Sequence, residues 1–593
     1  MEDVLIYPLK NDKDYSGILS AINGEGNIHI SGLLPVSKPN MVYSIFKDSS
    51  RQMMYIANTE YEAKKICDEL SVYLNKKVEF LTTTDIMFYH LDARDRKADA
   101  RNLKTILRLL KKEKIILVTS VEAITRKYVP KKIILDNIFK LKVGQTMDMQ
   151  DLARRLVDLG YQRVSKVEGF GQFSMRGGII DVFTLMYNFP LRLEFFDDEI
   201  DSIREFDIYS QKSIDKFKSV TITPSRDFIY PDDVGGAVEK IRAEVNDITD
   251  SDVFRNMEKI GAKEYFDGLE NYIDYMYEGQ DKSLFEYLAD DALIFIDDIS
   301  RYKERFKNIH SEFKDKYMLN LERGLAIRGQ GNLLYSLSDS IHWMGDRKLI
   351  VNSLLNKPVN DMNIQHDFNI DTREVPSYSG RIDMFVEDVK RLRHAGYKLV
   401  IAAATNDRAK KLSNMLNDND IDNIYTSKRD LEIKTSQVVV LAANIGQGFQ
   451  YPSIKFQVIT DREMLGANKQ GKKSKTKKKA KANSSKIDSF LDLKIGDYVV
   501  HENSGVGKYT GIEQISVNNI KRDYLKLVYQ GGDNLYVPID QMDKVQKYIG
   551  GDVERVKLNK LGSQDWSKAK RKVKKEIEDM TKELIDLYAK REA

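Results

Sequence analysis

Residues 495–509 read Ile-Gly-Asp-Tyr-Val-Val-His-Glu-Asn-Ser-Gly-Val-Gly-Lys-Tyr, and they open the densest β pattern of the chain. Short runs rich in β-branched and aromatic residues recur at 497–501, 507–513, 524–529 and 534–538. Gly531-Gly532-Asp533 separates the last two runs, and glycine tolerates the positive φ angles of a tight hairpin. This spacing predicts a small SH3/Tudor-like β-barrel over residues 491–548.

The segments on either side of this barrel differ sharply from it. Eight lysines and no acidic residue lie between Lys469 and Lys481, so we expect residues 466–490 to form a basic flexible linker. Contact of this tract with nucleic-acid phosphates is the alternative, but no aromatic residues are interleaved for base stacking. After the barrel, apolar residues from Trp566 to Leu587 recur every three or four positions, which predicts a long C-terminal helix within 549–593.

Upstream of the linker, the chain predicts several α/β and α+β domains. Buried β-rich runs at 52–57, 115–119 and 132–135 alternate with helical stretches, which is typical of a parallel sheet over 1–144. A small α+β insert with five glycines between short strands follows at 145–215. Residues 216–345 are mostly helical, with one strong strand at 292–296. A second α/β pattern covers 346–465.

Composition excludes several classes of protein. The chain has 593 residues, 42% hydrophobic and 31% charged, which is typical of an ordinary folded protein of several domains. Its single cysteine, Cys67, excludes a disulfide framework and a thiolate zinc site, and we expect no bound metal. No long apolar run and no leader are found, so we expect a cytoplasmic protein without a membrane contact.

The net charge of +4 comes from 94 basic and 90 acidic residues, and it is not evenly spread. Without the eight lysines of the linker, 86 basic residues would face 90 acidic ones. The chain is therefore a nearly neutral body with one local basic tract, which disfavours a protein that coats nucleic acid over its whole surface.

A degenerate phosphate loop lies near the N-terminus, at Gly32-Leu-Leu-Pro-Val-Ser37-Lys38-Pro39. A working loop of this type needs G-x4-G-K-[ST], whose second glycine lets backbone amides surround phosphate and whose hydroxyl binds magnesium. Here Ser37 replaces the glycine, and Pro39 replaces the hydroxyl residue and lacks an amide donor. We therefore expect this loop to bind no nucleotide.

An acidic pair, Asp297 and Asp298, ends the strand at 292–296. In an ATPase, carboxylates at this position hold the metal and activate water. Without a working phosphate loop, solvated aspartates that cap a strand are the simpler interpretation. Together the two remnants indicate an ATPase-derived domain that has lost its chemistry, with no catalytic residue and no cofactor.

Aromatic and arginine residues gather in the small insert, between Phe170 and Phe196. About half of the aromatic residues must face a core, because side chains alternate along a strand. An exposed arginine beside phenylalanine is favoured at protein interfaces, so this segment is a candidate contact surface.

The barrel segment also carries a resemblance to a known family. Ile495–Tyr509, Arg522–Leu525, Gly532–Pro538 and Lys557–Gly562 closely resemble the bacterial transcription-repair coupling factor family (Mfd), and the barrel alone resembles CarD-type transcription regulators. Met175–Phe183, followed by Arg192–Arg204, is similar to a segment that this family shares with the excision-repair protein UvrB. The resemblance extends over essentially the whole chain and is weaker at 216–345.

The resemblance implies a role for each domain. Residues 1–144, 145–215 and 216–345 would be UvrB-like domains 1a, 2 and 1b, with domain 2 docking on UvrA. Residues 346–465 would be α/β domain 3, and 491–548 would bind the β subunit of RNA polymerase through a barrel edge. In the family, an ATP- and magnesium-dependent superfamily 2 DNA translocase follows. By this resemblance, we expect residues 549–593 to be a linker and the start of the relay helix that leads to that motor.

The resemblance also implies site residues. For UvrA they are Arg176 and Phe183, with Arg163 and Arg192 as weaker candidates. For RNA polymerase they are Val499, Val500, His501, Glu502, Gly505, Val506, Gly507, Lys508 and Tyr509, although Glu502 stands where many relatives carry an apolar residue. The implied function is transcription-coupled DNA repair in the bacterial cytoplasm, at the nucleoid, by a monomer that recruits UvrA to a stalled polymerase. DNA would be bound mainly by the absent motor, and only weakly by the tract from Lys469 to Lys481.

Two other functions remain open from the sequence. One is a CarD-like transcription regulator with unrelated upstream domains, which would bind polymerase but not UvrA. The other is a cryptic ATPase that uses Lys38 and Asp297, which a nucleotide-binding titration would detect.

Overall fold

The structure is a computed structural model of the 593-residue chain. It describes residues 3–83, 96–245, 252–345, 347–355, 359, 362–378, 381–465, 495–501, 504–517, 520–538, 545–548 and 558–561. The chain forms two compact units, Met1–Lys473 and Ser474–Ala593. The lysine tract, Glu502 and the expected helix after Ser563 lie outside the described residues.

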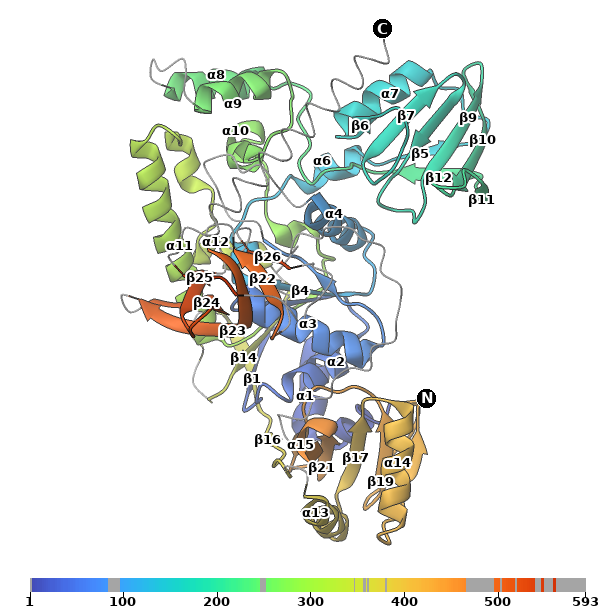
Figure 1. Ribbon diagram of the computed structural model, residues 1–593, viewed down its shortest axis with the longest axis vertical. Coiled ribbons are helices and arrows are strands. Elements are labelled where there is room, and N and C mark those ends of the chain that lie inside the picture. The colour runs from blue at the N-terminus through green and yellow to red at the C-terminus, as the bar shows by residue number, and fades with distance from the viewer. Residues whose placement is uncertain are drawn as a thin grey trace. The chain divides into compact units, whose positions relative to one another are not determined.

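A seven-stranded, fully parallel sheet forms the centre of the first unit (Figure 1). Its strands, in spatial order, are β15 (Ile364–Asn369), β1 (Asn27–Ser31), β14 (Lys348–Ser353), β13 (Leu293–Ile296), β2 (Met53–Ala57), β4 (Ile116–Ser120) and β3 (Glu79–Phe80). The central strands are buried along their whole length, as expected for a parallel sheet covered on both faces.

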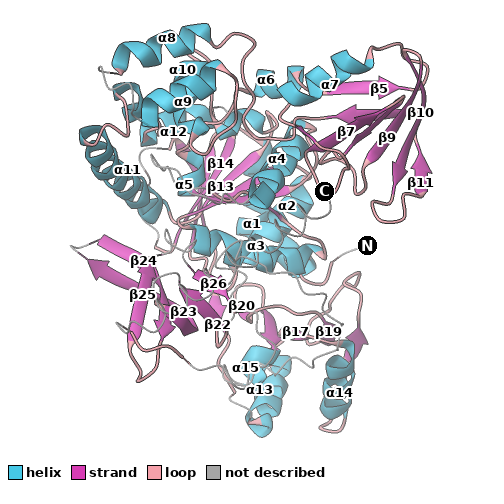
Figure 2. Ribbon diagram, turned by 45° about the horizontal axis from the view of Figure 1, so that its top comes forward, coloured by secondary structure: helices cyan, strands magenta, loops and turns pink. Residues whose placement is uncertain are grey.

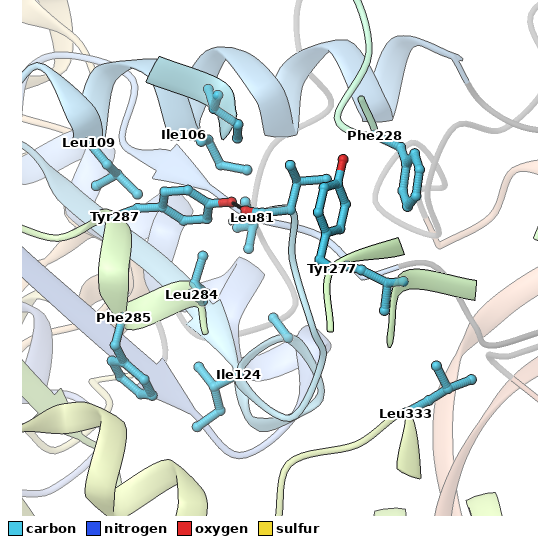
Figure 3. Close-up of a cluster of buried hydrophobic side chains, with 14 of the residues drawn as sticks. Leu81, Ile106, Leu109, Ile124, Phe228, Tyr277, Leu284, Phe285, Tyr287 and Leu333 are labelled. Carbon is cyan, nitrogen blue, oxygen red and sulfur yellow. Dashed lines mark hydrogen bonds between the residues drawn. The ribbon is translucent and has the colours of Figure 1, made fainter. Parts of the chain in front are cut away.

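Two hydrophobic cores cover the two faces of this sheet. One face packs on 3-10 helix η1 (Tyr7–Asn11), α1 (Lys13–Asn23), α2 (Lys38–Ser49) and α3 (Glu60–Leu74). The other packs on α4 (Arg96–Leu110), α5 (Val121–Ile124), α6 (Lys131–Asp136), η2 (Leu269–Tyr272), α10 (Ile273–Met276), η3 (Leu284–Tyr287), α11 (Ile299–Glu322), η4 (Arg328–Asn332) and α12 (Leu337–Met344). Figure 3 shows part of this second core, where Tyr277 and Tyr287 lie among aliphatic side chains. Two helices, α8 (Gly235–Glu244) and α9 (Asp252–Gly261), complete it.

A six-stranded antiparallel sheet with one parallel edge strand makes up the insert. Its order is β11 (Ser213–Lys216), β10 (Glu199–Phe206), β9 (Leu191–Phe196), β8 (Ile179–Val182), β7 (Gln172–Arg176) and β6 (Gln162–Arg163). Helix α7 (Met149–Asp158) packs on it together with the two-stranded sheet of β5 (Phe139–Lys142) and β12 (Ser219–Ile222), and Figure 2 shows α7 beside these strands. Asp148 caps α7 by accepting bonds from the amides of Gln150 and Asp151.

A third sheet lies between residues 373 and 460. Its order is β16 (Arg373–Glu374), β20 (Phe449–Tyr451), β21 (Phe456–Thr460), β17 (Lys398–Ala403), β19 (Val438–Ala442) and β18 (Ile424–Thr426). The flanking helices are α13 (Ile382–His394), α14 (Asn406–Asn417) and α15 (Asp461–Leu465). One of its faces shares a core with α1 to α3, because Val400, Phe449 and Tyr451 pack with the N-terminal segment Val4–Leu9.

Two details differ from the sequence-based expectation. The boundary expected at residue 346 is wrong, because β14 and β15 pair with β1 in the first sheet and the third sheet begins only at β16. The strand expected at 132–135 is helix α6, which begins directly after Pro130. A short apolar run fits a strand and a buried helix equally well, and only the packing decides between them. The expected mixed α/β organisation with several sheets is confirmed.

The second unit contains a five-stranded antiparallel sheet. Its order is β25 (Asn534–Pro538), β24 (Ile520–Val528), β23 (Gly505–Val517), β22 (Tyr498–His501) and β26 (Val545–Lys547). Gly531 and Gly532 both have positive φ angles and form the turn between β24 and β25, as expected from the sequence. Gly507 has no room for a side chain, since a Cβ there would lie 2.9 Å from the ring of Tyr529.

Candidate functional sites

The six-stranded sheet carries a row of charged residues on the face away from α7. The register places Ser174 beside Asp181, Asp181 beside Arg192, and Arg192 beside Arg204 on four successive strands. The residues before and after them in each strand, such as Ile180 and Leu193, point into the core with α7. Strand alternation therefore sorts apolar side chains to one face and this polar row to the other.

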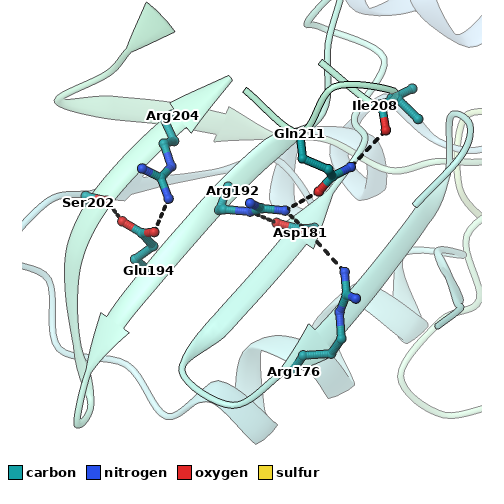
Figure 4. A network of polar contacts seen from close by, with 8 residues as sticks. All are labelled: Arg176, Asp181, Arg192, Glu194, Ser202, Arg204, Ile208 and Gln211. Atoms are coloured by element: carbon teal, nitrogen blue, oxygen red, sulfur yellow. Dashed lines mark hydrogen bonds and ion pairs between the residues drawn. The ribbon is translucent and has the colours of Figure 1, made fainter. Parts of the chain in front are cut away.

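Arg192 and Asp181 form the centre of this row (Figure 4). The guanidinium donates two bonds to the carboxylate, at 2.7 and 2.8 Å, and a third bond of 2.9 Å to Oε1 of Gln211. Its plane also lies over the ring of Phe206, 4.3 Å from the ring centroid. The bond to Asp181 raises the pKa of Arg192 above its usual value. Arg192 is thus committed to holding β8, β9 and the β10–β11 loop together.

Arg176 lies next to this pair but is free to contact a partner. Its guanidinium is 3.8 Å from Oδ2 of Asp181, and its side chain is 58% exposed, against 14% for Arg192. The nearby carboxylate orients the guanidinium of Arg176, and the exposed N–H groups remain available to a partner. Arg176 is therefore the best-placed charged contact residue on this face.

The aromatic residues of the insert divide between core and surface. Phe183 is only 5% exposed, and its ring centroid lies 4.3 Å from that of Phe170, which is 53% exposed. Phe196 and Tyr209 are 81% and 93% exposed. Phe183 is therefore largely buried beside Phe170, and its assignment to UvrA stays a prediction. Phe196 could have been found from the sequence, since it alternates with the buried positions 191 and 193 and the half-buried position 195.

Arg163 is exposed on β6, the edge strand of the sheet. Of the four arginine and phenylalanine positions that the sequence proposed, the structure thus leaves Arg163 and Arg176 accessible and holds Phe183 and Arg192 within the domain. The assignment of the two accessible residues to a partner stays a prediction.

Replacing Asp181 by alanine is expected to loosen this sheet strongly. The carboxylate is 3% exposed, and its removal would leave the largely buried Arg192 without its counter-ion. Such a loss costs about 3 kcal/mol. Because the chain has several domains, the suitable measurement is amide hydrogen exchange in β8 and β9, which reports local opening. The exposed turn variant Asp198→Ala is the control and should change little; equal protection in both variants would contradict the assigned role of the pair.

The second candidate site is the β22–β23 hairpin of the five-stranded sheet. Tyr498 pairs with Lys508 and Val500 with Val506, and these four side chains share one face of the two strands. The alternate residues Val499, His501 and Tyr509 are buried, and Val499 and Tyr509 belong to the core of the sheet. Lys508 is exposed, and Val500 and Val506 are half-buried. The sequence-derived segment therefore contributes Val500, Val506 and Lys508 to the surface, whereas Gly505 and Gly507 shape the hairpin.

The expectation that residues 499–509 form an exposed sheet edge is wrong. Strand β22 lies between β23 and β26, so its main-chain groups face a neighbour on either side. Strand β23 pairs with β22 over Gly505–Lys508 and with β24 over Lys508–Val517. The edge strands among the described residues are β25 and β26. A partner would therefore contact β22 and β23 through side chains, and strand addition would need β25 or β26.

The degenerate phosphate loop connects β1 to α2. Several of its backbone amides already donate hydrogen bonds to other groups of the protein. The amide of Leu34 donates to Oγ1 of Thr372 at 2.9 Å, and Thr372 donates in turn to the carbonyl of Gly32 at 2.8 Å. The amides of Ser37 and Lys38 both donate to the carbonyl of Leu34. A phosphate-binding loop needs such amides free and pointing inward. This loop is instead closed on itself and tied to the segment after β15.

Lys38 and Asp297, the two charged remnants, meet at the carboxyl ends of their strands. Nζ of Lys38 lies 2.5 Å from Oδ1 of Asp297, and the side chains are 13% and 12% exposed. Nδ2 of Asn352 also donates to Asp297, at 3.4 Å. Burial, reinforced by the charge of Asp297 and a hydrogen bond to it, raises the pKa of the Tyr55 hydroxyl well above its usual value. The lysine that would hold phosphate is thus neutralised by the acid that would hold a metal.

Asp298, the second residue of the acidic pair, is the N-cap residue of α11. It has a positive φ angle of 54° and caps α11, where its carboxylate accepts a bond from the amide of Arg301. Among the described residues, no group of three or more histidine, cysteine, aspartate or glutamate side chains is arranged to hold a metal ion. A search of the same residues for a helix long and apolar enough to span a bilayer also found none.

Comparison with known proteins identifies both candidate sites as parts of recognised domains. The sequence model of the UvrB interaction domain matches residues 139–228, which contain the six-stranded sheet, α7 and β5. The model of the CarD-like/TRCF RID domain matches residues 493–549, which contain the five-stranded sheet. These matches define a class of protein that joins a UvrB-type interaction domain to a CarD-like domain.

Whole-chain similarity points to one family. The chain is 32% identical to the transcription-repair-coupling factor of Staphylococcus haemolyticus (strain JCSC1435) over its full length, and 33% identical to that of Staphylococcus epidermidis (strain ATCC 12228) over 97% of its length. The factor of Staphylococcus aureus (strain MRSA252) is 31% identical over 99%. The chain is thus similar over its whole length to transcription-repair-coupling factors, and it spans about half the length of these curated relatives.

Proposed function

We propose that this chain acts in transcription-coupled DNA repair as a docking scaffold. Its six-stranded insert would bind UvrA, and its five-stranded sheet would bind the β subunit of RNA polymerase. The observation that carries this proposal is the match of two interaction-domain models to two separate sheets of one chain. The names of the relatives, transcription-repair-coupling factors, support a role that links transcription to repair.

The full-length similarity favours this proposal over a CarD-like regulator with unrelated upstream domains. Such a regulator would resemble coupling factors only across residues 493–549, whereas the similarity to the Staphylococcus haemolyticus factor covers 100% of the chain. On UvrA, Arg176 would be the central contact, and Arg163, Phe170 and Phe196 are further exposed residues of the same domain. On polymerase, the contact would be the face formed by Val500, Val506 and Lys508.

The scaffold proposal also includes the absence of ATP turnover in this chain. The ion pair between Lys38 and Asp297, together with the occupied amide of Leu34, supports this part. We expect the purified chain to release no phosphate from ATP above background, with or without duplex DNA. A coupled phosphate-release assay measures this, and Lys38→Ala is the matched variant. Turnover in the parent chain that disappears in Lys38→Ala would overturn the proposal in favour of a cryptic ATPase.

A further inference from the structure

The seven-stranded sheet collects exposed lysines at the edge opposite the degenerate phosphate loop. Because all seven strands are parallel, their amino ends meet at this edge, and α2, α3 and α4, which connect successive strands, all end there. Lys47 lies in the last turn of α2, Lys76 and Lys77 follow α3, and Lys111 and Lys114 follow α4. All five side chains are exposed, and we call them the lysine edge.

These lysines lie close enough together to influence one another. Nζ of Lys114 donates to the carbonyl of Lys47 at 3.4 Å and lies 5.2 Å from the ring centroid of Phe46. Partial burial and then the charge of Lys47 lower the pKa of Lys114; the charge of Asp48 opposes this, and that of Lys76 adds to it. The three side chains thus form one positive cluster, although they come from three different segments of the chain.

Several acidic residues at this edge have partners of their own, although Asp48 also acts on Lys114 and Asp291, just before β13, is exposed. Asp48 accepts a bond of 2.7 Å from the hydroxyl of Tyr15, Glu113 is paired with Arg108, and Asp290 lies 3.5 Å from Lys112. None of the five lysines forms an ion pair with a described residue, whereas many other surface cations of the chain do. The five lysines therefore lack a direct counter-ion among the described residues.

Lysines at helix ends also have a simpler explanation, because they offset the helix dipole. Each helix end carries about half a negative charge, so three ends bring roughly one and a half. Five lysines exceed that amount, and Lys114 lies beyond the end of α4 in the loop before β4. The dipole thus accounts for only part of the cluster.

We infer that the lysine edge binds the phosphate backbone of duplex DNA without sequence preference. Lysine side chains are compact point charges suited to phosphate, and such contacts supply most non-specific affinity. No large hydrophobic side chain is exposed among the described residues of this edge, so anchors for a protein partner and platforms for unpaired bases are both missing there. This inference does not depend on the proposed binding of UvrA or polymerase.

The experiment measures the salt dependence of binding to a fluorescein-labelled mixed-sequence duplex by anisotropy, between about 50 and 200 mM salt. All proteins compared are full-length chains in which the eight lysines from Lys469 to Lys481 are replaced by glutamine, so that the tract cannot mask the result. The test variant adds Lys47→Gln, Lys76→Gln and Lys114→Gln. The control adds Lys314→Gln, Lys390→Gln and Lys411→Gln, which remove the same charge from exposed helical positions elsewhere.

Each phosphate contact contributes about 0.9 to the slope of log K against log salt, so the test variant should lose about 2 to 3 of that slope. The control variant should keep the parent's slope. Failure of the parent to bind duplex, an unchanged slope in the test variant, or equal losses in test and control variants would each overturn the inference. Tighter binding of the parent to polyglutamate than to duplex would also overturn it, in favour of an acidic protein partner.

Discussion

Arg176→Glu is expected to weaken UvrA binding about thirtyfold, which corresponds to about 2 kcal/mol, while binding to the polymerase β subunit stays unchanged. Arg176 is an exposed residue beside the charged row, and its guanidinium lies 3.8 Å from the buried carboxylate of Asp181. Reversing its charge removes the donor that a partner would meet and places two carboxylates side by side. Biolayer interferometry with immobilised UvrA measures the effect.

Arg154→Glu is the matched control for this variant. Arg154 belongs to α7 in the same domain, its side chain is 76% exposed, and it forms an ion pair with Asp151 one turn away. The same charge reversal there should leave UvrA affinity within about twofold, because exposed pairs of this kind contribute less than 1 kcal/mol. Equal losses in both variants would show that net charge, and not the position of Arg176, governs binding.

Val500→Arg is expected to abolish detectable binding to the polymerase β subunit, with a loss of about a hundredfold or more. Val500 and its cross-strand neighbour Val506 form the apolar centre of the outer face of β22 and β23. An arginine at this half-buried position would place a charge in the desolvated centre of the contact. Retention of the β subunit on the immobilised chain is the measurement, with UvrA binding as the test of correct folding.

Asn534→Arg distinguishes a side-chain contact from strand addition. Asn534 is exposed at the start of β25, which is an edge strand of the described sheet. If polymerase binds the β22–β23 face, Asn534→Arg should bind like the parent. Loss of binding in Asn534→Arg with retention in Val500→Arg would instead assign the contact to the β25 edge.

Much of the fold follows from local sequence pattern. The strands at 53–57 and 116–120 lie where apolar, β-rich runs predict them. The assignment of β14 and β15 to the first sheet could not be predicted. It depends on pairing with β1, more than 300 residues away in sequence, and no local signal encodes such a partner.

The candidate sites were predictable to different degrees. The proximity of Lys38 and Asp297 could be predicted, because each follows a buried strand and the carboxyl ends of parallel strands lie at one edge of the sheet. Two other contacts could not be predicted, because both depend on how separate segments lie in space. They are the packing of Phe170 on Phe183 and the ion pair of Arg192 with Asp181. The position of β22 between two neighbours was missed because β26 is only three residues long and resembles a loop in sequence.

The central claim is that this chain holds two partners through separate domains and needs no nucleotide to do so. Sedimentation velocity of the chain with UvrA and the polymerase β subunit, in buffer without ATP, tests it most directly. We predict a single faster-sedimenting species that contains all three proteins, and its loss in Arg176→Glu and in Val500→Arg. Binding of the two partners only in turn, or of neither without nucleotide, would contradict the account.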